Sequence, residues 1–315
     1  MSVAYTPKRW SIWSRLLLLV IALFLITEVF LRSYLGFCDA VLMRADPHYE
    51  YIPQPNQDRC RYGHHIQYNS LSMRSEEPDS SAVLILGCGD SVINGGMMTD
   101  QDSLATTILS DRLSKTLGRK VQFLNIAAGS WGPDNCVAYL QHTPLPKPQA
   151  IVLFASSHDA HDNMVFSGVV GRMKHFPDEQ YPLAVLELVD RYLLPKLLRP
   201  KKDADEELGI SKGGHGFNPG FDGMVRYAEA RGIPLVLYMH AERSEIKVGN
   251  YNAQGQAILA FAEQAGLHVL KDLDHHVSVD ELRDNIHPTD RGQRTIATNI
   301  LKDIVSHPAA YGSAP

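Results

Sequence analysis

The stretch that most constrains how this chain can fold is residues 83–96, which read VLILGCGDSVINGG. Four consecutive apolar residues at its start predict a strand buried on both faces, as in the parallel sheet of an α/β domain. The glycines that follow predict tight turning, so Ser91 should lie just beyond the carboxyl end of this strand. In open α/β sheets that edge binds ligands. Two interpretations of Ser91 stay open here: a functional residue, or a serine that merely caps the next helix.

The composition excludes some classes of function. The chain has 315 residues, of which 44% are hydrophobic and 21% charged, as is ordinary for a globular protein. A formal net charge of -5 and a pI of about 6.3 argue against a nucleic-acid partner, which needs a basic face. The four cysteines form no CxxC pair and have no metal-ligand spacing, so neither a zinc site nor a disulfide scaffold is predicted.

An apolar segment near the N-terminus predicts a membrane anchor. Residues 16–27 carry no charge, and Arg15 and Glu28 flank them. A span needs about 20 mostly apolar residues. Residues 10–32 therefore qualify as a transmembrane helix if the two flanking charges reach the head groups.

Three alternatives compete with the anchor: a cleaved signal peptide, a buried core helix, and a lipoprotein signal that ends at Cys38. No small-x-small cleavage site follows the segment, and Phe37 is a poor residue to precede a lipoprotein cysteine, so a single-pass anchor is favoured. Basic residues precede the segment, which predicts that residues 1–9 are cytoplasmic and that the rest of the chain is extracytoplasmic, hence periplasmic in a Gram-negative cell.

The remaining chain divides into a lead-in and one α/β domain. Residues 33–81 contain several prolines, which predict little regular structure in a membrane-proximal lead-in that wraps onto the domain. In residues 82–315, strand-like and helix-like runs alternate, which predicts a parallel sheet with helices on both faces. The predicted strands are residues 83–86, 121–126, 150–155, 233–239 and 267–270. The first predicted helix follows Asp100 and Asp102 and ends at Gly118. Four further helices are predicted over residues 134–141, 221–230, 255–265 and 290–305.

Residues 173–216 interrupt this alternation. They contain one amphipathic stretch, residues 183–198, followed by a charged and glycine-rich run. This composition predicts an insertion between the third and fourth strands. A solvated loop is favoured over a lid.

A carboxylate and a histidine lie close together near the C-terminus. Asp284 and His287 are three residues apart, on a predicted loop beyond the fifth strand and just before the last helix. A carboxylate can hold one ring nitrogen of a histidine and leave the other free as a base. Such a base needs a nucleophile, and Ser91 is predicted at the same edge of the sheet.

These residues resemble the motifs of the SGNH, or GDSL, hydrolases, a family with three-layer, flavodoxin-like α/β/α domains of about five parallel strands. Its first block is matched by Gly89-Asp90-Ser91, and its last block, DxxH, is matched by Asp284 and His287. The resemblance covers residues 82 to the end of the chain. It implies that Ser91 is the nucleophile, that His287 is the base and that Asp284 orients His287.

The resemblance also implies an oxyanion hole, whose donors depart from the family pattern. The family uses the nucleophile's N–H and a glycine N–H after the second strand; here Gly129 or Ser130 is favoured, with Gly132 as a further candidate. The third block normally supplies an asparagine, and this chain has His158 at that position. An imidazole N–H can donate to an oxyanion, so His158 is predicted to replace the asparagine.

Other polar residues invite weaker interpretations. A cluster of His158, Asp159, His161 and Asp162 contains metal-ligand types, but no further ligand set stands out nearby, so no metal is predicted. Cys88 is expected to be a small buried residue. His240, at the end of the fourth strand, is interpreted equally well as a core residue and as a substrate contact.

We therefore expect a serine esterase that needs no cofactor and hydrolyses O-acyl, in particular O-acetyl, esters. The predicted anchor places the site beside the cell envelope, which favours an ester on an extracytoplasmic glycan over another acylated small molecule. The lead-in, YIPQPNQD and IQYNSLSMRSEE, loosely resembles membrane-anchored SGNH-like proteins of bacterial polysaccharide assembly, which agrees with this by analogy. Two alternatives stay open: a polysaccharide O-acyltransferase with the same triad, and a non-catalytic, membrane-anchored glycan-binding or assembly scaffold. The sequence does not indicate the oligomeric state.

Overall fold

The centre of the fold is a five-stranded parallel sheet. A computed structural model describes residues 11–198 and 216–312. The sheet has the order β6-β5-β7-β8-β9, with all neighbours parallel. In order of appearance this is 2-1-3-4-5, the flavodoxin-like doubly wound order. The predicted α/β/α fold class is confirmed. The strands are β5 (Val83–Gly89), β6 (Val121–Ala127), β7 (Ala150–Ser156), β8 (Leu235–His240) and β9 (His268–Lys271).

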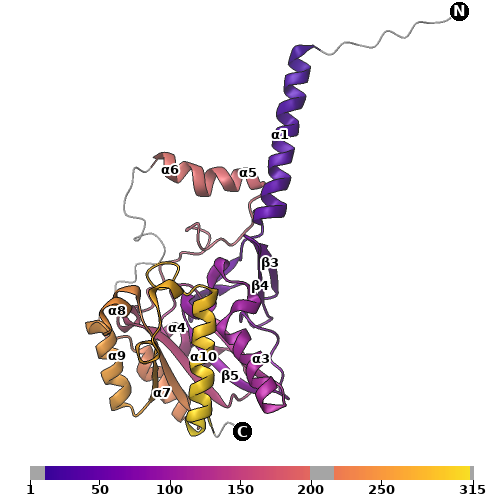
Figure 1. The fold of residues 1–315 in the computed structure, drawn as a ribbon. Coiled ribbons are helices and arrows are strands. Elements are labelled where there is room, and N and C mark those ends of the chain that lie inside the picture. The colour runs from indigo at the N-terminus through magenta and orange to yellow at the C-terminus, as the bar shows by residue number, and fades with distance from the viewer. Residues whose placement is uncertain (1–10, 199–215, 313–315) are drawn as a thin grey trace, which may run out of the picture.

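Helices cover both faces of this sheet (Figure 1). One core contains side chains of α3 (Ala105–Leu117) and α10 (Asp290–Ser306), and the other contains those of α4 (Pro133–His142), α7 (Gly220–Glu229) and α9 (Ala253–Gln264). Two shorter helices, α2 (Ser91–Asn94) and α8 (Arg243–Val248), follow the carboxyl ends of β5 and β8. Because α3 and α4 lie on opposite faces, the ends of β5 and β7 form the point where ligands bind in such sheets.

The lead-in contains regular structure, so the prediction of little such structure in residues 33–81 is wrong. It folds into two antiparallel hairpins, β1 (Met43–Asp46) with β2 (Glu50–Pro53), and β3 (Gln57–Arg61) with β4 (His64–Tyr68). The prolines do not prevent this because Pro53 is the last residue of β2 and the others lie outside the strands. Tyr51 and Ile52 are buried in the same core as the sheet.

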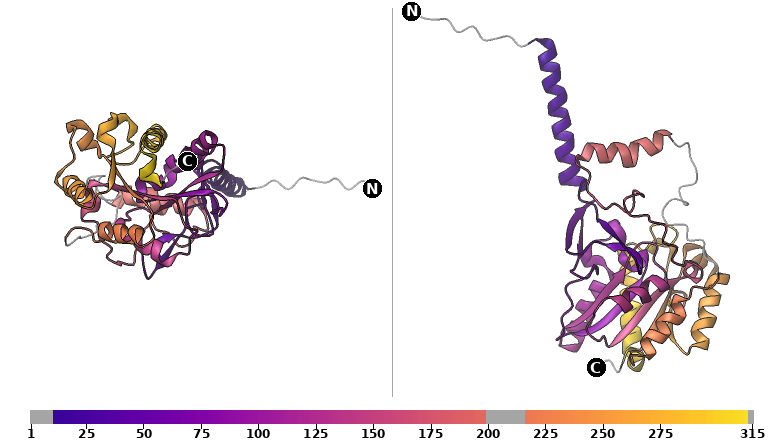
Figure 2. Two further views of the ribbon diagram at one scale, coloured as in Figure 1. Left: turned by 90° about the horizontal axis from the view of Figure 1, so that it is seen from below. Right: turned by 180° about the vertical axis from the view of Figure 1, so that it is seen from behind.

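The N-terminal helix α1 (Ile12–Leu35) stands away from the domain (Figures 1 and 2). Its length and composition are sufficient to cross a membrane, and only 11% of its most apolar window is buried. Ile26, for example, is 65% exposed, so α1 is not a core helix. Residues 1–10, including the predicted cytoplasmic segment and the first residue of the predicted anchor, lie outside the described residues.

The insertion between β7 and α7 contains a helix, as its amphipathic stretch predicts. It consists of α5 (Ala184–Glu187), a π-helical segment (Leu188–Leu193) and α6 (Leu194–Leu198), and we call these residues 184–198 the insertion helix. Figure 1 and the right panel of Figure 2 show it running across the direction of α1, starting near the end of α1 that is closer to the domain. The charged run that was predicted to follow it, residues 199–215, lies outside the described residues.

Candidate active site

Ser91 begins a short helix directly after the first core strand, and the residue before it supplies the cap. The carboxylate of Asp90 accepts a hydrogen bond from the Val92 N–H at 2.8 Å. Gly95 ends the helix with φ of 74°, and a Cβ atom there would lie 2.6 Å from the Leu104 side chain. Since Asp90 is the capping residue, the Ser91 hydroxyl is not used as a cap.

The Ser91 hydroxyl contacts the predicted base. Oγ of Ser91 lies 2.8 Å from Nε2 of His287, and Nδ1 of His287 lies 2.7 Å from Oδ2 of Asp284. The other carboxylate oxygen of Asp284 accepts the backbone N–H groups of Ile286 and His287. The structure thus brings together all three residues predicted as the triad, in the order hydroxyl, imidazole, carboxylate.

The Asp284 carboxylate is held in its charged form. Partial burial by itself raises its pKa, but the hydrogen bonds from the His287 side chain and from the two backbone N–H groups outweigh this effect and hold the pKa of Asp284 well below its usual value. An ionised Asp284 accepts the Nδ1–H of His287. The hydrogen on His287 is therefore on Nδ1, and Nε2 faces Ser91 as an acceptor.

Two backbone N–H groups near Ser91 are available as donors. Within the described part of the chain, the N–H groups of Ser91 and Gly129 donate no hydrogen bond. Ser130 follows Gly129 with φ of 57°, and the Tyr51 hydroxyl donates to the carbonyl oxygen of Gly129 at 2.9 Å. Tyr51, from the lead-in, thereby fixes the turn that carries the predicted oxyanion donors.

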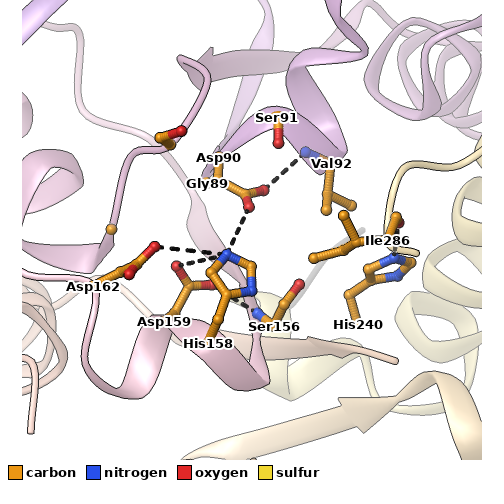
Figure 3. Close-up of polar contacts among 12 residues, drawn as sticks. Gly89, Asp90, Ser91, Val92, Ser156, His158, Asp159, Asp162, His240 and Ile286 are labelled. Atoms are coloured by element: carbon orange, nitrogen blue, oxygen red, sulfur yellow. Dashed lines mark hydrogen bonds and ion pairs between the residues drawn. The ribbon is translucent and has the colours of Figure 1, made fainter. Parts of the chain in front are cut away.

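The imidazole of His158 faces carboxylates on both of its ring nitrogens. Its Nε2 lies 3.6 Å from Oδ2 of Asp90, and its Nδ1 lies 3.4 Å from Oε1 of Glu242. Figure 3 shows the same Nε2 facing Asp159 and Asp162 as well, each at 3.9 Å. Both ring nitrogens face carboxylates, and His158 does not line the cavity that contains Ser91. The geometry therefore does not direct His158 toward an oxyanion beside Ser91.

The carboxylates around His158 set its charge. Burial on its own lowers the pKa of His158, but Asp159, followed by Asp90 and Glu242, raises the pKa well above its usual value. Burial raises the pKa of Asp159 to about 8, because that residue is 1% exposed. We therefore assign an imidazolium that the ionised carboxylates of Asp90 and Glu242 hold.

Among the residues that the structure describes, two groups of side chains have the residue types and proximity of metal ligands. One consists of Asp90, His158 and Asp159, and the other of His268, Asp303 and His307. In the first, the protonated His158 already supplies the positive charge between the carboxylates. In the second, Asp303 receives hydrogen bonds from both histidines, at 2.7 and 2.8 Å. His161, which the sequence grouped with His158, instead contacts the carbonyl of Gly216 through its Nδ1.

Sequence reasoning missed the residues that hold the loop of the histidine. His240 at the end of β8 is buried; its Nδ1 lies 2.6 Å from Oδ2 of Asp272, and its Nε2 lies 2.8 Å from the carbonyl oxygen of Ile286. His240 is thus a core residue, and it positions the residue that precedes His287. Its place at the end of a strand was the only sequence signal.

An arginine holds the same loop from a different side. The Arg243 side chain donates to the carbonyl oxygens of Asp284 and Leu282, at 2.7 and 2.8 Å. Arg243 is about 40 positions before its partners, so no local spacing could have indicated this contact. The loop that bears Asp284 and His287 is therefore fixed from β8 and α8.

A cavity of about 280 Å³ opens beside Ser91. Besides the triad, its walls contain the turn at Gly129 and Ser130, the lead-in and the segment before the insertion helix. The side chains that give it an apolar character are Val41, Met43, Met97, Met98 and Phe176. It can hold a small group with apolar atoms against the Ser91 hydroxyl.

Cys88, two residues before Asp90, offers no second nucleophile beside Ser91. All four cysteines are free thiols. Cys88 is fully buried, and burial raises its pKa. The prediction that Cys88 is a small buried residue is confirmed.

No protein-family model and no curated protein sequence matches this chain. Among solved structures, it is similar to a lipase/acylhydrolase from Enterococcus faecalis, with 14% identity, coverage of 71% of this chain and 96% of that chain, and a TM-score of 0.43. It is also similar to a two-domain esterase active on acetylated mannans, with 13% identity, coverage of 71% of this chain and 49% of that chain, and a TM-score of 0.43. For an acetylxylan esterase from Geobacillus stearothermophilus the identity is 11%, the coverage is 72% of this chain and 96% of that chain, and the TM-score is 0.38. These values are low, so we base the function on the geometry of the site.

Proposed function

We propose that this protein is a serine esterase of the SGNH type that hydrolyses O-acyl esters through Ser91, His287 and Asp284. The observation that carries the proposal is the 2.8 Å contact between Oγ of Ser91 and Nε2 of His287, with Asp284 on the other ring nitrogen. A serine hydroxyl is a weak nucleophile unless a base accepts its proton in this way.

In the proposed reaction, Oγ of Ser91 attacks the ester carbonyl while its proton passes to Nε2 of His287. The tetrahedral oxyanion accepts the N–H groups of Ser91 and Gly129, with Ser130 as the adjacent candidate donor. His287 then gives the proton to the leaving alcohol, which leaves an acyl group on Ser91. A water molecule, deprotonated by His287, releases the acid. The ionised Asp284 stabilises the imidazolium in both halves of the reaction.

We further propose an O-acetyl or other short acyl ester on an extracytoplasmic glycan as the substrate. The small apolar volume beside Ser91 supports a short acyl group. The exposed apolar surface of α1 supports a membrane anchor, because contact with lipid would remove these apolar side chains from water. Specific contacts between Glu28 of α1 and the insertion support retention of α1 over a cleaved signal. Under the proposed topology, residues 1–9 are cytoplasmic and residues 33–315 are extracytoplasmic.

The test uses the purified full chain in detergent. A fluorophosphonate probe is expected to label Ser91, and a small acetyl ester is expected to be hydrolysed; both signals should be lost in Ser91→Ala and kept in Ser306→Ala, an exposed position at the end of α10. Equal turnover by wild type and Ser91→Ala would overturn the proposal. Absence of both signals in the wild type would favour a non-catalytic scaffold. Transfer of the acetyl group to an added oligosaccharide faster than to water would favour an acyltransferase.

A further inference from the structure

The insertion helix, residues 184–198, exposes leucines on the surface that is not packed against the protein. One side is firmly held, since Ala184 and Glu187 are fully buried. By contrast, Leu186 is 47% exposed, Leu193 43% and Leu197 78%. Leu194, in the same helix, is 39% exposed. Several exposed leucines on one helix mark a surface that contacts something other than water.

The start of the insertion helix is hydrogen-bonded to the C-terminal part of α1. The carboxylate of Glu28 in α1 accepts the N–H groups of Ala184 and Val185, at 2.8 and 3.0 Å. One turn later, Arg32 donates to the carbonyl oxygen of Pro182 at 2.8 Å. Glu28 is 8% exposed, so it caps the start of the insertion helix from within the packed junction.

This junction marks the end of the apolar part of α1. The 24 residues of α1 extend about 36 Å, which matches the thickness of a bilayer's hydrocarbon core with part of its head-group layers. Glu28 and Arg32 are its last charged residues. The domain lies beyond the C-terminal end of α1 (Figures 1 and 2). If α1 crosses a bilayer, these charges lie at its outer head-group layer. A helix that starts there and runs perpendicular to α1 lies parallel to the membrane surface.

We infer that the insertion helix is a second membrane contact, lying in the outer head-group layer of the bilayer that α1 crosses, with Leu186, Leu193, Leu194 and Leu197 in contact with lipid. The inference rests on the membrane crossing in the proposed function and not on the esterase activity. The charged residues of the helix are two acids and two bases, Glu187, Asp190, Arg191 and Lys196. Contact with lipid is therefore driven by burial of the leucines, and it should not require anionic lipid.

The contact has a consequence for the cavity beside Ser91. Arg191 of the insertion helix, His175 to Pro177 before it, and Ala40 and Val41 after α1 all line that cavity. The chain segments next to α1 and the insertion helix thus form part of the cavity wall. The site is held close beneath the bilayer surface, where an ester on a membrane-bound carrier or a nascent envelope polymer can reach it.

Lipid photo-crosslinking tests this arrangement. The full chain is reconstituted in nanodiscs of phosphatidylcholine alone, with photoreactive benzoylphenylalanine (Bpa) at one position at a time. The test variants are Leu193→Bpa and Leu197→Bpa. Val20→Bpa is the reference in α1, and Val305→Bpa is the control. Val305 is 67% exposed and apolar, but lies at the end of α10 far from α1. Lipid adducts are expected at positions 193, 197 and 20, and none at 305.

Each other outcome overturns the inference in a distinguishable way. An adduct at position 20 without one at 193 or 197 means that α1 is in the membrane and the insertion helix is not. A dimer adduct at 193 or 197 means that a second copy covers the leucines. No lipid adduct at position 20 removes the membrane crossing itself. Hydrolysis of a small soluble ester by the same samples reports on the esterase separately.

Discussion

Oγ of Ser91 and Nε2 of His287 lie 2.8 Å apart, although 196 positions separate the two residues in the chain. Ser91 is held by the turn that ends β5, and His287 by a loop fixed from β8 and α8. The contact therefore depends on the packing of the whole sheet, and it can be weakened from several places that never touch a substrate.

Asp284→Asn tests the proposed triad most cleanly. The amide oxygen can still accept the two backbone N–H groups, so the loop should keep its shape. The amide cannot stabilise an imidazolium or fix the tautomer, and kcat/KM for a small acetyl ester is expected to fall about 10⁴-fold. Asp280→Asn, at an exposed position on the same segment, should keep the wild-type rate. A rate for Asp284→Asn close to that of the wild type would remove Asp284 from the triad.

His158→Asn should change kcat by less than about tenfold, since loss of a real oxyanion donor costs about 10²–10³-fold. The reason is geometric: both ring nitrogens of His158 face carboxylates, and the imidazole does not line the cavity. Steady-state kinetics on the acetyl ester provide the measurement. A loss of 10²-fold or more, with a matching loss in the rate of fluorophosphonate labelling of Ser91 and an unchanged free energy of unfolding, would return His158 to the oxyanion hole.

His240→Ala should slow labelling of Ser91 by a fluorophosphonate, because Ile286 loses its contact and the adjacent His287 is less well positioned. The free energy of unfolding should fall by about 1–3 kcal/mol, since Asp272 loses a buried partner. The matched control is His268→Ala, which removes a histidine–aspartate contact at the exposed edge of the sheet and should leave the labelling rate unchanged. Equal labelling rates in the two variants would exclude a positioning role for His240.

Glu187→Gln should loosen the insertion helix from the lead-in. Glu187 pairs with Arg61, and both side chains are fully buried. Removing one charge leaves the other buried without its partner, at a cost of about 3–5 kcal/mol. Hydrogen exchange of residues 184–193 should therefore increase. Asp190→Asn, a change on the same helix, removes an exposed pair with Lys174, which lies before the helix, and should have little effect. Similar exchange in both variants would contradict the assigned importance of the buried pair.

Asp159→Asn should flatten the dependence of stability on pH. Burial raises the folded-state pKa of Asp159 from 3.8 to about 8, so the folded protein binds a proton that the unfolded chain has lost between these values. This contribution is fully present below pH 3.8 and is lost as the pH rises through about 8. Urea midpoints measured from pH 5 to 8 should fall less steeply in Asp159→Asn than in wild type. Asp111→Asn, in an exposed pair, should keep the wild-type slope; the same slope in Asp159→Asn would show that Asp159 is ionised throughout.

The sequence by itself determined the order of the elements and the positions of the proposed catalytic groups. Alternation of apolar and amphipathic runs is a local property, so each core strand begins within two residues of its prediction. Ser91 and His287 could be placed at one edge because the carboxyl ends of parallel strands lie together. The exposed apolar helix near the N-terminus could also be predicted, because its length and composition alone indicate a helix that can cross a membrane.

The tertiary structure decided what each polar side chain faces. In sequence, His158 stands where the SGNH motif that this chain resembles has an asparagine. In the structure its ring nitrogens face the carboxylates of Asp90 and Glu242, the residues just before α2 and α8. The role of His240 depends on Asp272 and Ile286, which are 32 and 46 positions away. The hairpins of the lead-in and the packed side of the insertion helix form only against the rest of the chain. Long-range electrostatics and burial fix such choices, and neither is contained in a local pattern of residues.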